Sequence, residues 1–299
     1  MTGIGGLVLV GLVGLVGLAG LVAFSILAAY LLIHPPRKEP SRPTPSDVGL
    51  PFASVTFASH DGLRLTGWLV GPELRRPPVV VLHGYRDQKS SYLEHARFLF
   101  DHGFPTLLYD QRGHGESAPA AVSLGPLESA DVGEALRMLH SRGLGARFVV
   151  WGISMGAATA LLAAARLNPI AGVIAESSFE RIDHVLADTI RLRFHLPSFP
   201  VVPLVLAAAS LLSRCNLFRV HIGDAVEAMG SRPLLLVSGA EDRRMTPEHG
   251  KRLLARSSGP TEHLVIAGAD HAQCWPLGKA LYSEGALRLL RAAGVAGRS

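Results

Sequence analysis

Residues 148–168 carry the clearest chemical pattern: a short apolar run, then Gly-Ile-Ser-Met-Gly, then an alanine-rich segment. This order predicts a strand, a tight turn centred on Ser154, and a helix that begins at Met155. Gly152 and Gly156 leave room for the strained backbone that such a turn imposes on the serine. The turn would present the serine hydroxyl as a nucleophile, with the first amides of the helix facing any anion that forms beside it. An ordinary strand-to-helix turn has the same spacing, so the partners of the serine decide between the two interpretations.

A serine hydroxyl needs a base to take its proton, and the base needs a carboxylate to hold its tautomer. The chain has 13 histidines, so position must select among them. His271 lies in a loop directly after the apolar segment 262–266, and parallel-sheet enzymes place their active sites at such strand ends. We therefore expect His271 to act as the general base for Ser154.

Several carboxylates compete for the role of the acid. Asp242 and its neighbour Glu241 follow the apolar segment 234–238, Asp270 precedes the histidine, and Glu176 ends an earlier strand. Asp242 is favoured, because a short carboxylate at the tip of this loop reaches the imidazole without folding back.

An oxyanion hole would need two backbone N–H donors. One is expected from Met155, at the start of the helix after the serine. The second is expected from His83-Gly84-Tyr85-Arg86, which directly follows the apolar segment 79–82, with the Tyr85 amide as the best placed donor. Each donor of this kind contributes about 2.7–4 kcal/mol in the transition state. The alternative is that Gly84 is simply a turn glycine.

The segments that must position these residues alternate between strand-like and helical patterns. The expected strands are 54–57, 63–70, 79–82, 106–109, 148–151, 172–176, 234–238 and 262–266. The expected helices are 92–102, 129–141, 155–167, 247–256 and 278–293. This alternation predicts the α/β class, with a mostly parallel eight-stranded sheet covered by helices on both faces. The first two strands, joined at Asp61-Gly62, would form an antiparallel edge.

The alternation is interrupted at residues 179–232, where apolar helical segments are broken by Pro197, Pro200 and Pro203. An insertion at this point predicts a helical lid over the active-site end of the sheet. Residues 189–223 contain four arginines and no acidic residue, so contact with anionic lipid headgroups is a second interpretation of part of this segment.

Residues 3–33 contain no charged side chain. As a helix they would be about 46 Å long, more than the roughly 30 Å of a bilayer's hydrocarbon core, which predicts one transmembrane anchor. A cleavable signal peptide is the alternative, but its apolar core is usually about 7–15 residues behind a basic start, and no Lys or Arg precedes this run.

The proline-rich residues 34–51 predict an extended linker between the anchor and a domain over residues 52–299. Arg37, Lys38 and Arg42 follow the apolar run directly. The positive-inside rule therefore predicts a single-pass membrane protein whose catalytic domain is cytoplasmic.

Five motifs, in this order, resemble the α/β-hydrolase superfamily and, within it, the membrane-anchored alpha/beta-hydrolase-domain (BEM46-like) proteins. They are His83-Gly84-Tyr85, Asp110 to Ser117, Gly152 to Gly156, Gly239 to Asp242, and Gly268 to His271. The resemblance implies an α/β-hydrolase fold, a triad with Ser154 as nucleophile, Asp242 as acid and His271 as base, and no cofactor or metal. It also implies that residues 112–117 hold the loop beside the serine.

We therefore expect a membrane-anchored serine hydrolase that cleaves an ester, thioester or similar acyl bond of a small-molecule or lipid substrate through an acyl-serine intermediate. The alternatives are a serine peptidase of the same fold and a non-catalytic scaffold, which would not need all three triad residues. The pI near 9.6 does not indicate nucleic acid, because the basic residues are scattered outside any binding motif. Cys215 and Cys274 match no metal spacing, and no pattern specifies an oligomeric state.

Overall fold

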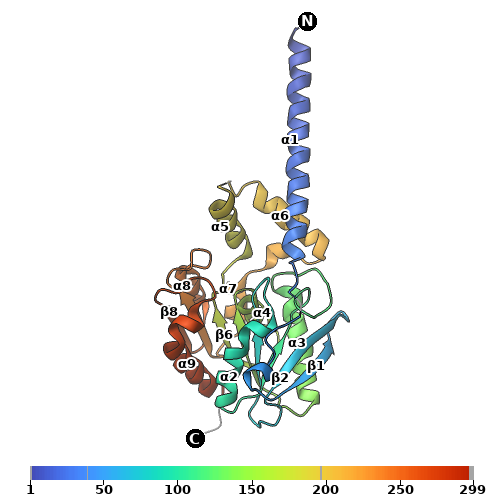
Figure 1. The fold of residues 1–299 in the computed structure, drawn as a ribbon. Helices are drawn as coiled ribbons and strands as arrows, with labels where there is room; N and C mark the ends of the chain where they lie inside the picture. Colours follow the sequence, from blue (N-terminus) through green and yellow to red (C-terminus); the bar gives the residue numbers. More distant parts are fainter. Residues whose placement is uncertain (1, 39, 196, 296–299) are drawn as a thin grey trace.

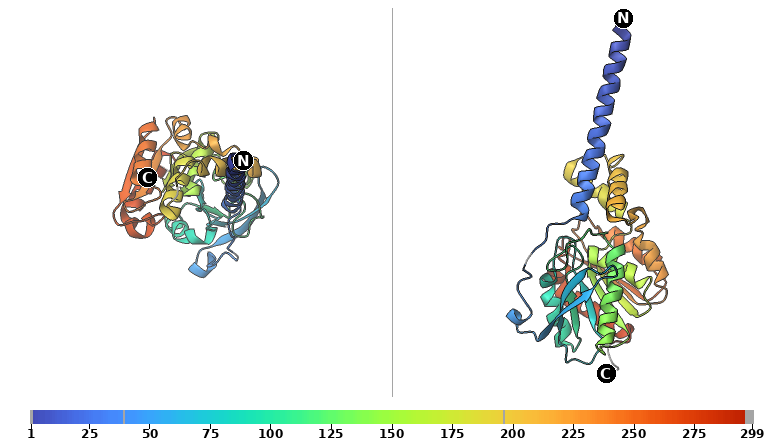
Figure 2. Two further views of the ribbon diagram at one scale, coloured as in Figure 1. Left: turned by 90° about the horizontal axis from the view of Figure 1, so that it is seen from above. Right: turned by 90° about the vertical axis from the view of Figure 1, so that its right-hand side faces the viewer.

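The computed structural model describes residues 2–38, 40–195 and 197–295. A long helix, α1 (Thr2–Ile33), projects from a layered domain, and helices α5 (Ile182–Phe194) and α6 (Val201–Ser213) lie at the same end of that domain (Figure 1). Figure 2 shows from a second direction that α1 passes beside these two helices before it extends alone. We call α5 and α6 the lid.

The centre of the domain is one eight-stranded sheet with the strand order β1-β2-β4-β3-β5-β6-β7-β8. The strands are β1 (Phe52–Ala58), β2 (Arg64–Val70), β3 (Val79–Leu82), β4 (Thr106–Tyr109), β5 (Phe148–Ile153), β6 (Ile170–Glu176), β7 (Leu234–Gly239) and β8 (Thr261–Ile266). β1–β2 and β2–β4 pair antiparallel, and the remaining pairs are parallel. Strands β3 to β7 are fully buried because helices cover both faces. The predicted α/β sheet with its antiparallel edge is confirmed.

Two apolar clusters, one on each face of the sheet, form the core. The remaining helices are α2 (Leu93–Asp101), α3 (Pro126–Ser141), α4 (Met155–Ala164), α7 (Ile222–Ala228), α8 (Pro247–Arg256) and α9 (Cys274–Ala292), with short 3₁₀ turns at Ser46–Val48, Lys89–Tyr92 and Leu217–Arg219. Side chains of α3, α4, α7 and α8 share the first cluster, and those of α2 and α9 share the second. The lid and the last turns of α1 join the first cluster, so they extend the core beyond the end of the sheet.

The lid segment differs in detail from the sequence prediction. Pro203 does not break a helix but lies in the first turn of α6, where the missing proline N–H would have no helical partner. Asp188, one residue before the acid-free stretch, pairs with Arg191 at 3.9 Å, so the lid is less uniformly basic than the sequence suggests. The side chain of Arg193 lies outside the described residues. Helix α7 packs against α4 and α8 and belongs to the layer that covers the sheet.

The proline-rich segment after α1 follows the surface of the domain instead of spacing it from the helix. Arg37 donates hydrogen bonds to the carbonyl oxygens of Gly115 (2.8 Å) and Ser117 (2.7 Å). Ser41 is buried and donates to Asp110 (3.2 Å). The segment predicted as an extended linker is therefore attached to the domain, and these contacts hold the C-terminal end of α1 against it.

Helix α1 has two parts with different surroundings. From Gly6 to Gly20 every side chain is exposed, whereas Ser25, Ala29 and Ile33 near its C-terminal end are buried, the last two completely. The buried part packs mainly against α6. One end of this apolar helix is thus a component of the folded domain.

Candidate active site

Ser154 lies at the sharp turn between β5 and α4. Its φ of 56° and ψ of −117° are unusual for a residue with a side chain, and they point its hydroxyl away from the sheet. A Cβ atom on Gly152 would collide with the backbone of Gly156, and one on Gly156 would collide with the carbonyl group of Leu82. The two glycines of the motif are therefore required by close backbone packing.

The structure brings Ser154, His271 and Asp242 together in one hydrogen-bonded row. The Ser154 Oγ lies 2.9 Å from His271 Nε2, and the opposite ring nitrogen, Nδ1, lies 2.7 Å from the Asp242 carboxylate. With the proton on Nδ1, the imidazole donates to the carboxylate and accepts from the serine hydroxyl. This is the geometry in which a histidine can take the proton of an attacking serine.

Asp242 is held as a carboxylate by its surroundings. Burial by itself raises its pKa, but hydrogen bonds from His271 and from the amides of Met245 (2.8 Å) and Arg244 (2.9 Å) outweigh this, and the pKa lies below its ordinary value. The side chain is completely buried. Its negative charge therefore faces the imidazole and stabilises the protonated ring.

The other carboxylates considered for this role have different partners. Asp270 accepts a hydrogen bond from the amide of His271 (2.7 Å). Glu176 accepts one from the amide of Cys274 (3.0 Å), and burial raises its pKa. Glu241 is exposed. Burial also raises the pKa of the Cys274 thiol, which makes it a poor second nucleophile.

The loop after β3 lies against the serine, where the second oxyanion donor was expected. A Cβ on Gly84 would stand 3.4 Å from the Ser154 Cβ. Among the described residues, the amides of Tyr85 and Met155 have no protein acceptor, and Met155 is the first residue of α4, so its N–H is free by helix geometry. Both amides are available to an anion beside Ser154.

Two neutral histidines hold the loop after β3 in place by accepting hydrogen bonds from backbone amides. The amide of Arg86 donates to His114 Nε2 (3.2 Å), and the amide of Gln111 donates to His83 Nε2 (2.9 Å). Burial lowers the pKa of both rings, to about 3 for His114. Because they stay neutral, these rings can accept the amide hydrogens that fix the loop.

A cavity of about 650 Å³ extends from the serine. Ser154, Met155, Tyr85 and His271 lie at its base, and its walls come from α5, α6, the Arg244–Met245 loop and, unexpectedly, the last turns of α1. The walls are mostly aliphatic or aromatic. Small residues are also common in the exposed part of α1, so the sequence did not indicate that these turns face the cavity.

Comparisons with known proteins show which proteins this chain is similar to. A family model described as serine aminopeptidase, S33, matches residues 75–215. An esterase from Pyrococcus furiosus, Pf2001, superposes with a TM-score of 0.72 at 22% identity, covering 87% of this chain and 97% of that structure. The chain has the α/β-hydrolase fold.

Three relatives are examples of the proteins to which this chain is similar. YqkD of Bacillus subtilis is 26% identical over 77% of this chain and 76% of its own length. A membrane protein of Saccharomyces cerevisiae, YNL320W, is 25% identical over 70% and 69%. The thiohydrolase AneE of Aspergillus aculeatus is 31% identical over 48% of each chain. The Pyrococcus furiosus protein and AneE are both named for hydrolytic activity.

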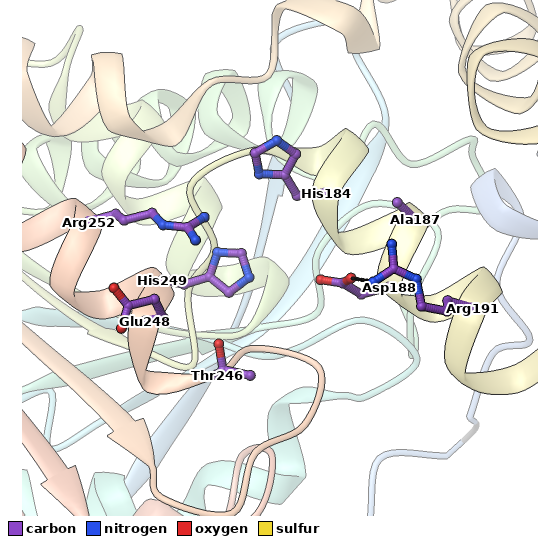
Figure 3. A pocket seen from close by; sticks show the side chains of 8 residues that line it. All are labelled: His184, Ala187, Asp188, Arg191, Thr246, Glu248, His249 and Arg252. Atoms are coloured by element: carbon purple, nitrogen blue, oxygen red, sulfur yellow. Dashed lines mark ion pairs between the residues drawn. The ribbon is translucent and has the colours of Figure 1, made fainter. Parts of the chain in front are cut away.

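The domain has a second, smaller cavity of about 230 Å³ between α5 and α8. Figure 3 shows His184 and Asp188 of α5 facing His249 and Arg252 of α8, with Thr246 at the base. Both acidic groups (Asp188, Glu248) and basic groups (Arg191, Arg252) line this cavity. This second cavity lies between the lid and the body of the domain, next to the Arg244–Met245 loop.

One group of side chains in the described part of the chain has the composition of a metal site: His60, Asp61 and Asp131. The guanidinium of Arg112 lies among them and donates to Asp131 (2.7 Å) and Asp61 (2.9 Å). The group is therefore an ion-pair network whose positive charge is Arg112, and it fixes the loop that begins at Asp110.

Proposed function

We propose that this chain is a membrane-anchored serine hydrolase that cleaves an ester or thioester bond through an acyl-Ser154 intermediate. The observation that carries the proposal is the row formed by Ser154, His271 and Asp242, with two unpaired amides beside the serine. A scaffold would have no need for this arrangement.

In the proposed reaction the Ser154 oxygen attacks the substrate carbonyl and His271 takes the hydroxyl proton. The amides of Tyr85 and Met155 stabilise the oxyanion of the tetrahedral intermediate. Collapse of the intermediate breaks the bond to the alcohol or thiol, which receives the proton from His271. Water, deprotonated by the same histidine, then attacks the acyl-serine, releases the carboxylic acid and restores the serine hydroxyl.

A peptidase activity is less well supported, although the matching family model is named for an aminopeptidase. An aminopeptidase must bind the charged amino terminus of its substrate, which calls for a carboxylate near the nucleophile. The cavity lining that the structure describes contains two arginines and no carboxylate. Aminoacyl anilides are therefore expected to be poor substrates compared with esters of the same size.

Membrane anchoring is proposed from the exposed part of α1. Residues Gly6–Ile33 have a mean hydropathy of 2.7, and side chains such as Leu7 and Val10 are more than 70% exposed. An apolar surface of this size is stable in a bilayer and not in water. The residues after α1 predict a cytoplasmic domain, which protease protection in sealed vesicles of known orientation would test.

The experiment that tests the reaction is labelling of the full-length protein with a fluorophosphonate, followed by identification of the modified peptide. We expect the label on Ser154 and its loss in Ser154→Ala. Ser238→Ala is the matched control, because Ser238 also lies 2.9 Å from a histidine, His263, but is buried away from the cavity. Labelling that survives Ser154→Ala, or an unlabelled wild type, would refute the assignment.

A further inference from the structure

The last turns of α1 form one wall of the cavity that contains Ser154. The lining residues from this helix are Phe24, Leu27, Ala28, Leu31 and Leu32. The Tyr85 hydroxyl donates to the carbonyl oxygen of Leu32 (2.8 Å), which ties this wall to the loop that carries an oxyanion donor. The helix that would anchor the enzyme is therefore also part of its substrate-binding surface.

The position of the wall along α1 places the cavity beside the membrane surface. At about 1.5 Å per residue, the stretch from Thr2 to Gly20 is about 28 Å long, close to the ~30 Å hydrocarbon core of a bilayer. Burial against the domain begins at Leu21, and the cavity wall begins at Phe24. In a bilayer that covers the exposed part of α1, the cavity starts within about one helical turn of the lipid.

The apolar edge of the lid faces the same side. Phe199, in the connection between α5 and α6, is 76% exposed, and Leu192 near the end of α5 is 50% exposed. Figure 1 shows this connection at the end of the domain from which α1 extends. Apolar side chains of the lid are therefore exposed at the end of the domain from which α1 extends.

The charges at the base of the cavity favour a negative group. Arg86 and Arg244 line it together with Ser154 and His271, both arginines are exposed, and the described lining includes no carboxylate. Arginines bind phosphate and carboxylate groups well because the guanidinium offers several N–H donors in one plane.

We propose that the substrate is an anionic lipid with a single acyl chain, which enters from the bilayer and is held between α1 and the lid while Arg86 and Arg244 bind its charged headgroup. This inference rests on the proposed serine hydrolase function. The cavity volume of about 650 Å³ lies within the usual range for one bound ligand, about 300–1,000 Å³. Helix α1 then determines the preferred chain length.

The test uses the full-length enzyme in nanodiscs with 1-acylglycerol 3-phosphates of 4 to 18 carbons, the matching neutral monoacylglycerols, and palmitoyl-coenzyme A as a soluble anionic thioester. Ala28→Phe places a ring in the cavity, and Ala23→Phe makes the same change on the exposed side of α1 outside it. Arg244→Gln removes a lining charge, and Arg243→Gln removes the neighbouring exposed one that does not line the cavity.

We expect Ala28→Phe to lower kcat/KM for 16-carbon substrates by about tenfold or more, and for 4-carbon substrates by less than about twofold. The control variant Ala23→Phe should change kcat/KM for either substrate by less than about twofold. Arg244→Gln should raise KM by about tenfold for the phosphate-bearing lipids only, with little effect of Arg243→Gln. If Ala28→Phe does not fold, Leu27→Ala, which enlarges the cavity, should shift the optimum to longer chains.

Equal effects of Ala28→Phe and Ala23→Phe, no preference for long or anionic substrates, or faster turnover of the soluble thioester than of the bilayer lipids would overturn the proposal. These outcomes differ from failure of the proposed function, because Ser154 would still react with fluorophosphonate and short esters would still be hydrolysed.

Discussion

The two sides of the active-site cavity are assembled in different ways. On the sheet side, Ser154, Asp242 and His271 each follow a parallel strand of the sheet, and hydrogen bonds of 2.7 to 2.9 Å join them. On the opposite side, α1, α5 and α6 meet through apolar side chains from segments more than 140 residues apart in the sequence. The sheet side carries the catalytic residues, and the helical side limits which substrates reach them. Changes to the sheet side should therefore lower kcat, and changes to the helical side should alter chain-length preference and stability.

The largest effect is expected on the sheet side. Ser154→Ala and His271→Ala should each lower kcat for ester hydrolysis by up to about 10⁶-fold, and the double variant should lose little more, because the residues act as one unit. Steady-state rates on a short ester measure this. Additive losses in the double variant would mean that the two residues act independently.

The acid should show an intermediate effect. Asp242→Asn is expected to lower kcat by about 10⁴-fold, because an amide no longer fixes the proton on the Nδ1 atom of His271. Glu176→Gln is the control, since Glu176 is buried nearby but bonds to Cys274. Near-normal turnover by Asp242→Asn together with loss in Glu176→Gln would reverse the assignment.

Truncation separates the two parts of α1. A chain that begins at Leu21 keeps the cavity wall and should remain folded and active after leaving the membrane. A chain that begins at His34 lacks the buried Ala29 and Ile33 and leaves α6 uncovered, and each large apolar side chain removed costs about 1.5–3 kcal/mol.

We therefore expect the shorter chain to have a Tm lower by several degrees and at least about a tenfold lower rate on long-chain esters. Thermal unfolding and turnover of the two truncated proteins, side by side, measure the effect. Equal stability and equal chain-length preference would show that α1 is only an anchor.

The contact between the two sides should have a smaller effect. Tyr85→Phe removes the hydrogen bond to Leu32 and keeps the backbone amide, so it should reduce kcat about three- to tenfold, in line with a net 0.5–1.5 kcal/mol for one hydrogen bond. The KM for short esters should stay unchanged. A loss as large as that of Ser154→Ala would assign a direct chemical role to the phenol.

The smallest expected effect concerns stability and pH. Burial raises the folded-state pKa of Glu176, so the folded protein keeps a proton that the unfolded chain has already lost, and stability falls as pH rises from the unfolded pKa through the folded one. Glu176→Gln removes this titrating group. The Tm of the variant minus the Tm of the wild type should therefore increase as the pH rises over that range. A Tm difference that does not change with pH would contradict the buried, raised-pKa state.

Much of the sheet and of the catalytic row could be predicted because its signals are local. Eight apolar segments bounded by turns gave the strands, and the loop after each strand of a parallel sheet opens at the same end. The glycines on both sides of Ser154 indicated that this turn has no room for side chains at those positions. The sequence distinguished Asp242 from Glu176 less clearly, because the choice depends on which carboxylate faces the imidazole of His271. Only the distances in the folded structure show this.

The sequence by itself determined that residues 3–33 are apolar enough to form a membrane helix, that Ser154 lies at a strand-to-helix turn, and which loops could supply its partners. Only the tertiary structure decided that the last turns of this helix pack on α6 and line the cavity beside Ser154. The physical reason is that lipid and a protein core select the same apolar side chains, so composition cannot distinguish a surface in the bilayer from one buried against the domain. That distinction depends on contacts between segments far apart in the chain.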